Sequence, residues 1–289
     1  MRAPVTGSFL VGLLALWACS PGAPSGSPPP ENRPAAAAAT SEPMQSTAPS
    51  KPVERLKVRV LATIPHDTNA YTQGLVWTDG ALYESAGQYG ESTLRQVDPK
   101  TGQVLRSVAV PPSYFAEGLA RAGDRLVQLT WQEGVALLYD LATFERRGEL
   151  PYSGEGWGLC QDGQRLIMSD GSDVLTFRDP STFAATGRVN VTLNGGPVPQ
   201  LNELECVDGA VYANVYTTQD IVRIDPGTGR VTAVIDASGL LSREEMMRVD
   251  VLNGIAYKPE TKTFLLTGKN WPKMFEVVFE PGRPSPDEG

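Results

Sequence analysis

Five short segments of the sequence share a common opening, and the first residue of each opening can take part in chemistry. The openings lie 44, 40, 45 and 51 residues apart, and most continue with glycine and then leucine or isoleucine. Their first residues supply one carboxylate, three side-chain amides and one indole: Glu117, Gln73, Asn202, Asn253 and Trp157. A carboxylate among amide and apolar groups is suited to general acid–base catalysis, with polar N–H groups stabilising developing negative charge.

Glu117 is the candidate catalytic residue of this set. It follows Phe115 closely, and aromatic surroundings should raise its pKa, so that it can both accept and return a proton. Two other interpretations stay open here: a channel glutamate paired with Lys269, or one bound to a structural cation. A single carboxylate does not suit a glycosidase, which needs two. The lone histidine, His66, is expected to be a structural turn residue.

The spacing of the openings indicates the fold that carries them. A turn signal such as Asp79-Gly80 follows most openings, and short apolar runs come next, as in β-hairpins. A repeat of 40–50 residues made of short strands is typical of a propeller blade, so the sequence predicts an all-β fold, a five-bladed β-propeller. The last repeat, 255–280, has room for three strands, and a strand at 57–64 would pair with it and close the ring. A capping box at Ser242–Glu245 predicts a short helix up to about Val249.

In such a ring, equivalent residues of successive repeats surround one opening of the central channel. The end of the second strand of a hairpin lies beside the start of the first, so residues there should face the same opening. This second set consists of Gly87, Trp131, Gly171, Tyr216 and Lys269. Together the two sets predict a small-ligand pocket with aromatic walls and a few convergent polar groups.

The N-terminal part of the chain is predicted to be a targeting segment and a tether. Arg2 precedes an apolar stretch, 9–17, that is too short to span a bilayer, and the sequence up to Cys19 resembles a bacterial lipobox. Residues 1–19 are interpreted as a lipoprotein-type signal peptide that leaves a lipid on Cys19; ordinary signal-peptide cleavage is the alternative. We expect an exported protein, either a periplasmic or cell-surface lipoprotein or a secreted protein.

The remaining boundaries follow from composition. The Pro-, Ala- and Ser-rich residues 20–52 are expected to form a disordered tether, 53–281 the catalytic propeller domain and 282–289 a disordered tail. A net charge of −8 disfavours nucleic acid and anionic membranes as partners, so the only membrane contact expected is the lipid. We expect a monomer.

Histidine and cysteine contents limit the possible metal and disulfide chemistry. One histidine in 289 residues argues against a histidine-built zinc site, and three cysteines argue against a disulfide scaffold. Cys160 and Cys206 follow the openings of the third and fourth repeats. A disulfide between them and two buried free thiols are both open interpretations.

Seven segments, in order and at matching intervals, resemble the plant-type (type I) glutaminyl cyclases, also called glutaminyl-peptide cyclotransferases. The resemblance extends over about 58–279. The segments are Pro65-His66-Asp67 with Tyr71–Leu75, Phe115–Leu119, Leu129–Trp131, Glu155–Leu159, Leu201–Glu205, Asn253–Tyr257 and Leu266–Pro272.

That family is a five-bladed propeller that converts the N-terminal glutamine of peptides to pyroglutamate with loss of ammonia. The resemblance implies that Glu117 is the catalytic glutamate and that peptides or proteins with N-terminal glutamine are the substrates. It also implies a pocket lined by Gln73, Phe115, Trp131, Trp157, Asn202 and Lys269. Tyr71 and Tyr216 stand where phenylalanine and tryptophan are expected, and as pocket residues they keep an aromatic wall but add a hydroxyl.

The implied chemistry suits these residues and requires no metal or other cofactor. One carboxylate can carry a proton from the attacking amine to the leaving amide nitrogen. The oxyanion that develops at the carbonyl of the γ-amide needs donors, and Gln73, Asn202, Lys269 or a tryptophan indole N–H can supply them.

Two other functions are compatible with the same residues. The first is a non-catalytic propeller that binds a peptide or small ligand at the channel mouth without turnover. The second is a metal-dependent hydrolase with Glu117, Asn202 and Asn253 as oxygen ligands, which EDTA would inactivate.

Overall fold

The computed structural model describes residues 51–282, and its regular structure there is β-strand apart from one short helix, so the fold is all-β. The predicted signal peptide with the predicted lipidation site Cys19, nearly all of the predicted tether and the predicted tail, 283–289, lie outside the described residues. Within 51–282, no helix is long and apolar enough to cross a membrane.

Three four-stranded antiparallel sheets follow one another along the chain, and within each the strands pair in chain order. The first sheet contains β2 (Thr72–Thr78), β3 (Ala81–Ala86), β4 (Thr93–Val97) and β5 (Val104–Ala109). The second contains β6 (Ala116–Ala122), β7 (Arg125–Thr130), β8 (Val135–Asp140) and β9 (Arg146–Pro151). The third contains β10 (Leu159–Gln161), β11 (Leu166–Met168), β12 (Val174–Arg178) and β13 (Ala185–Asn190).

The other strands form a larger sheet in the order β16-β17-β18-β19-β1-β22-β21-β20. They are β1 (Glu54–Pro65), β16 (Leu201–Val207), β17 (Ala210–Val215), β18 (Asp220–Asp225), β19 (Arg230–Asp236), β20 (Leu252–Lys258), β21 (Thr263–Gly268) and β22 (Lys273–Pro281). A small hairpin that the sequence did not indicate, β14 (Thr192–Leu193) with β15 (Gly196–Pro197), joins this sheet through β19.

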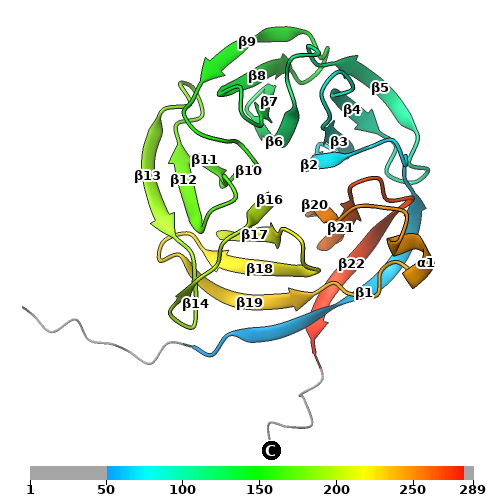
Figure 1. Ribbon diagram of the computed structural model, residues 1–289, viewed down its shortest axis with the longest axis vertical. Coiled ribbons are helices and arrows are strands. Elements are labelled where there is room, and N and C mark those ends of the chain that lie inside the picture. Colours follow the sequence, from blue (N-terminus) through cyan, green and yellow to red (C-terminus); the bar gives the residue numbers. More distant parts are fainter. Residues whose placement is uncertain (1–50, 283–289) are drawn as a thin grey trace, which may run out of the picture. The chain divides into compact units, whose positions relative to one another are not determined.

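Strand β1 closes the ring of sheets seen in Figure 1. It pairs antiparallel with β22, from Leu56 opposite Pro281 to Pro65 opposite Lys273, which confirms the predicted pairing of the N-terminal strand with the last repeat. Its first residues, from Glu54 to Lys57, also pair in parallel with β19, a contact that no sequence pattern indicated. Because β1 covers both β19 and β22, neither is left as an open sheet edge there.

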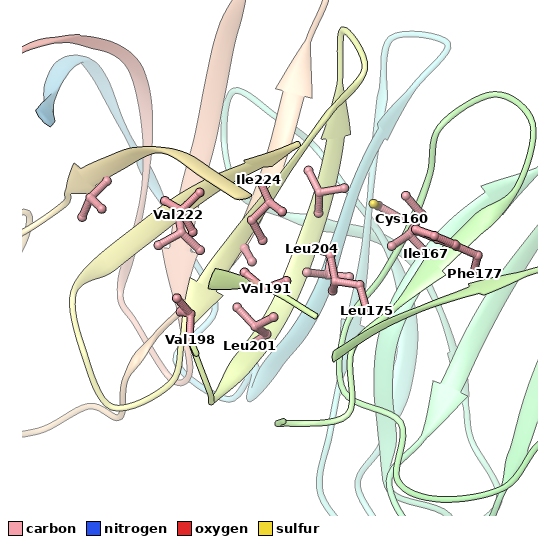
Figure 2. Close-up of a cluster of buried hydrophobic side chains, with 14 residues drawn as sticks. Cys160, Ile167, Leu175, Phe177, Val191, Val198, Leu201, Leu204, Val222 and Ile224 are labelled. Atoms are coloured by element: carbon pink, nitrogen blue, oxygen red, sulfur yellow. The ribbon is translucent and has the colours of Figure 1, made fainter. Parts of the chain in front are cut away.

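The strands nearest the centre of the ring are β2, β6, β10, β16 and β20, while β5, β9 and β13 lie outermost and β1 lies outside β19 (Figure 1). This arrangement explains the burial patterns, because β2 and β6 are buried almost throughout, whereas β5 exposes every second residue. The apolar core fills the spaces between neighbouring sheets. Figure 2 shows one such cluster, in which Leu175 and Phe177 of β12 lie in the same core as Leu204 of β16 and Ile224 of β18.

The single helix, α1 (Arg243–Met246), precedes β20 and begins with the predicted capping box. The Ser242 side chain accepts from the Glu245 N–H, and the Glu245 carboxylate accepts from the Ser242 N–H. The helix is shorter than predicted. The N–H of Arg248 donates to the Glu245 carbonyl, only three residues back, and the N–H of Asp250 donates to the Lys269 carbonyl. The chain therefore leaves the helix and approaches β20 before another α-helical turn forms.

Candidate active site

The candidate site is a pocket of about 330 Å³ that all nine predicted site residues line. These residues are Tyr71, Gln73, Phe115, Glu117, Trp131, Trp157, Asn202, Tyr216 and Lys269. The structure adds Gln88, which the sequence comparison of repeats missed because it lies one residue beyond the second set.

The two sets of repeat residues meet because of a recurring backbone hydrogen bond. In four repeats, the residue just after the second strand donates its N–H to the carbonyl two residues before the opening residue. These bonds are Gly87 to Tyr71 at 2.8 Å, Trp131 to Phe115 at 2.9 Å, Tyr216 to Gln200 at 2.8 Å and Lys269 to Val251 at 2.9 Å. The side chains that follow β7, β17 and β21 are thereby fixed beside those that start β6, β16 and β20.

Three residues of the two sets of repeat residues, Asn253, Gly87 and Gly171, do not line the pocket. Asn253 is fully buried behind it, and its Nδ2 donates to the Thr72 carbonyl at 3.0 Å and to Gln73 Oε1 at 3.1 Å. Asn253 was expected to be a polar group of the mouth, but it holds Gln73 in place instead. Gly87 and Gly171 leave room for aromatic rings. A Cβ on Gly87 would lie 2.4 Å from a ring carbon of Phe115, and one on Gly171 would lie 2.6 Å from the Trp157 ring.

Glu117 is buried at the inner end of the pocket, with 5% of its surface exposed. Its Oε1 accepts a 2.8 Å hydrogen bond from Gln73 Nε2. Because Asn253 holds the other end of the Gln73 amide, Asn253 also helps to fix the position of the Glu117 carboxyl. Burial raises the pKa of Glu117 well above its ordinary value; the Lys269 ammonium opposes this rise, and the carboxylates of Glu155 and Glu133 add to it. The direction agrees with the one expected from the aromatic surroundings.

Lys269 is the cationic group of the pocket. Its Nζ lies 4.7 Å from the ring centroid of Tyr71 and 5.0 Å from that of Tyr216, which are cation–π distances. It forms no ion pair within 4.0 Å with any described residue, so the interpretation of Glu117 as its paired partner is wrong. Burial lowers the pKa of Lys269, while the charges of Glu117 and Asp250 partly restore it.

The hydroxyl of Tyr71 has a partner outside the pocket lining. It donates to Asp250 Oδ2 at 3.1 Å, and burial together with this carboxylate raises the pKa of Tyr71. The hydroxyl therefore stays protonated and bonded to Asp250, and the ring keeps the wall that a phenylalanine would provide.

The two tryptophans of the pocket share one hydrogen-bond acceptor. Trp131 Nε1 and Trp157 Nε1 donate to the same oxygen, Glu155 Oε2, at 2.8 and 2.9 Å. The expectation that an indole N–H could serve as an oxyanion donor is therefore wrong, because both indole N–H groups of the pocket already donate to Glu155. With Gln73 Nε2 bonded to Glu117, the ammonium of Lys269 and the amide of Asn202 are the remaining donors among those considered.

The other residues singled out from the sequence lie outside the pocket. His66 is buried directly after β1, with Nε2 2.8 Å from Glu84 Oε1 and Nδ1 2.7 Å from the Trp271 carbonyl oxygen, as expected for a structural residue. Cys160 of β10 and Cys206 of β16 form a disulfide. Among residues 51–282, histidine, cysteine, aspartate and glutamate form no group of three able to hold a metal ion.

Comparison with known proteins gives a consistent result. Residues 34–279 match a family model described as glutamine cyclotransferase. A glutaminyl-peptide cyclotransferase of Arabidopsis thaliana is 38% identical over 226 residues, which cover 76% of this chain and 71% of that protein. The crystal structure of a glutaminyl cyclase from Myxococcus xanthus superposes with a TM-score of 0.73 at 42% identity, covering 80% of this chain and 99% of that one.

Proposed function

Since the chain belongs to the glutamine cyclotransferase family, we propose that it is a glutaminyl-peptide cyclotransferase that works in the pocket around Glu117. It converts the N-terminal glutamine of peptides to pyroglutamate and releases ammonia. The observation that carries this assignment is the placement of Glu117. Among the described residues that line the pocket it is the only carboxylic acid, and it stands between an amide donor, aromatic walls and a lysine.

Glu117 acts as the proton carrier of the reaction. The substrate's α-amine nitrogen attacks the carbonyl carbon of its own side-chain amide (Cδ), and the new C–N bond gives a tetrahedral intermediate. The Glu117 carboxylate takes the proton that the attacking nitrogen loses and returns it to the γ-amide nitrogen, which leaves as ammonia. Gln73 occupies Oε1, while Oε2 makes no hydrogen bond to a described residue and is the atom left for the substrate.

Lys269 is the group best placed to stabilise the oxyanion that forms from the carbonyl oxygen of the side-chain amide. A buried ammonium without an ion-pair partner among the described residues is a strong, preorganised hydrogen-bond donor. The aromatic walls supply a further contribution by confining the glutamine side chain, so that its amide carbonyl carbon stays close to its own amine.

The proposed mechanism uses no metal or other cofactor. It is supported by the single carboxyl of the pocket, because a hard cation is usually held by more than one carboxylate. Chelation provides the direct test.

We also propose that the ring of sheets is a five-bladed β-propeller. The three separate four-stranded sheets supply three blades, and β16–β19 supply the fourth. The fifth consists of β20, β21 and β22 with β1 as its outermost strand, which the antiparallel pairing of β1 with β22 supports.

The cellular location is proposed from the sequence of residues 1–19 alone. The chain is exported and carries a lipid on Cys19. Membrane fractionation of the full chain and of its Cys19→Ala variant tests this, since the lipidated form partitions with membranes and the variant does not.

The test of the activity is incubation of the full chain with a short peptide that begins with glutamine. Mass spectrometry should show the loss of one ammonia per peptide, and this loss should persist in EDTA and disappear in Glu117→Gln. A loss abolished by EDTA would overturn the metal-free mechanism. Binding of the peptide without any loss above the spontaneous background would favour the non-catalytic binding protein.

A further inference from the structure

Glu155 is a carboxylate beside the pocket that the proposed reaction does not use. It lies between β9 and β10 and is half-buried behind the two tryptophans. Its Oε2 accepts from Trp131 Nε1 and Trp157 Nε1, while Oε1 accepts from Gln132 Nε2 at 3.0 Å. One side chain therefore joins a tryptophan that follows β7 to a tryptophan that precedes β10, in two neighbouring sheets.

The backbone around Glu155 is fixed against the end of β7. The N–H of Gly156 donates to the Trp131 carbonyl at 2.9 Å. A Cβ on Gly156 would lie 2.3 Å from the Tyr152 hydroxyl and 2.8 Å from the Thr130 carbonyl oxygen, so only glycine permits this approach. The Tyr152 hydroxyl in turn donates to the Thr130 carbonyl. The segment that carries Glu155 is thus held in place independently of the indole bonds.

The charge of Glu155 is stabilised by neutral donors alone. It forms no ion pair within 4.0 Å with any described residue. Burial by itself would raise the pKa of Glu155, but the hydrogen bonds from Trp157, Gln132 and Trp131 outweigh it, and the pKa is lowered. Glu155 is therefore ionised at neutral pH, and its negative charge raises the pKa of Glu117.

We propose that Glu155 is a positioning residue of the cyclisation: its Oε2 holds both indoles in place as the pocket walls. The part that concerns catalysis rests on the proposed function, whereas the part that concerns the indoles does not. Because the walls confine the glutamine side chain near its own amine, releasing them should lower kcat more than it raises KM.

Two substitutions separate the hydrogen bonds from the charge. Glu155→Ala removes both, and we expect kcat/KM to fall about 100-fold, the cost of misplacing reacting groups by roughly 1 Å. Glu155→Gln keeps a side-chain oxygen for the indoles but removes the charge. It should restore most of kcat, while the acidic limb of the pH–rate profile moves to lower pH, because Glu117 loses a neighbour that raises its pKa.

Glu133→Gln is the matched control for charge. Glu133 also raises the pKa of Glu117, but its carboxylate accepts from the Tyr89 hydroxyl at 2.8 Å and the Phe115 N–H at 3.4 Å, whereas both pocket indoles donate to Glu155. This variant should move the acidic limb in the same direction without changing the signal of the tryptophans. Six charged or titratable groups interact electrostatically with Glu117: Lys269, Glu155, Glu133, Tyr71, Tyr89 and Tyr152.

The near-ultraviolet circular dichroism of the full chain reports the indoles directly, whether or not the protein is a cyclase. We expect the tryptophan bands to change in Glu155→Ala and to stay like the wild type in Glu155→Gln and Glu133→Gln. Unchanged bands in Glu155→Ala, or equal loss of kcat in Glu155→Gln and Glu155→Ala, would overturn the proposal. If the wild type releases no ammonia, the proposed function fails, and the circular dichroism series still decides whether Glu155 orders the indoles.

Discussion

At Glu117, burial and a neighbouring ammonium act on the same proton in opposite directions. Removal from water favours the neutral acid, and the charge of Lys269 favours the carboxylate. The balance lies on the side of the acid, so the pKa of Glu117 is well above the ordinary value. A carboxyl tuned upward in this way can accept a proton from an amine and return it within one catalytic cycle.

Glu117→Gln should reduce kcat by about 10²- to 10⁴-fold, the usual contribution of a general acid–base group. In the wild type, kcat/KM should fall as the pH drops through the raised pKa of Glu117, because the reaction begins with the carboxylate. The same shift has an opposite consequence for folding. A carboxyl whose pKa is raised in the folded state contributes stability below its unfolded pKa, and this stability is lost as the pH rises through the folded pKa.

The variant should therefore be less active but more resistant to urea than the wild type at neutral pH. Steady-state kinetics and urea unfolding on the same preparations measure both effects. A variant that lost activity and stability together would indicate a structural role for Glu117 rather than the proposed proton transfer.

Gly87 and Gly171 shape the aromatic walls, because each lets a ring approach more closely than a Cβ would allow. Gly87 lies so close to Phe115 that an added Cβ would also come within 2.7 Å of the Ala116 carbonyl oxygen. Backbone cannot move away as the end of a flexible side chain can, so the wall and the start of β6 would both have to shift. Gly87, one of the two glycines in the second set of repeat residues, is thus part of how the pocket is built.

Gly87→Ala should raise KM, lower kcat and reduce the free energy of unfolding by about 1–3 kcal/mol, the usual cost of overpacking. Gly196→Ala is the control, because its Cβ would meet only one atom within 4 Å, the Leu193 carbonyl oxygen at 3.7 Å. Kinetics and urea unfolding of the two variants provide the comparison. Equal behaviour of the two would show that the close approach at Gly87 is not needed.

At the scale of strands, the sequence patterns predicted the features that depend on residues close together in the chain, above all the hairpins. The repeat openings and the turn signals after them located the hairpins, and the pairing of the N-terminal strand with the last repeat followed from counting strands. The two sets of site residues met as expected because the hydrogen bonds between Trp131 and Phe115 and between Tyr216 and Gln200 follow directly from hairpin geometry.

Such patterns could not predict the long-range contacts between side chains. The bonds from two tryptophans to Glu155, and the inward turn of Asn253 toward Gln73, depend on how separate sheets approach one another. The parallel pairing of β1 with β19 was also missed, because it joins residues that no repeat relates.

Removing β1 should prevent the ring from closing. A chain that starts at residue 66 lacks the strand that covers both β19 and β22, whereas one that starts at residue 51 keeps it. We expect the longer chain to unfold cooperatively in urea and the shorter one to lack a cooperative transition and to aggregate through its exposed strand edges. Circular dichroism and size-exclusion chromatography distinguish these results, and equal unfolding midpoints would show that β1 is dispensable.

At the scale of the whole molecule, a strand and a disulfide link parts of the ring that are far apart in sequence. Strand β1 links β19 to β22 through backbone hydrogen bonds. The disulfide between Cys160 and Cys206 links β10 to β16, beside the apolar cluster of Figure 2, where Cys160 packs in the same core as Leu204. Both links constrain how the separate sheets close into one body, whereas the pocket depends on the strand ends that face the ring's centre.

The double variant Cys160→Ser/Cys206→Ser should therefore lose stability without losing the active site. The cross-linked residues are 46 apart in sequence, and restricting a loop of that length in the unfolded chain stabilises the folded state by about 4 kcal/mol in the chain-entropy model. Neither cysteine lines the pocket around Glu117, so kcat of the folded variant should equal that of the wild type. Urea unfolding with and without a reductant measures the stability, and the reductant should lower the midpoint of the wild type but not of the variant. A fall in kcat under conditions where the variant remains folded would mean that the disulfide also fixes the distance between Trp157 and Asn202, which the same two inner segments carry.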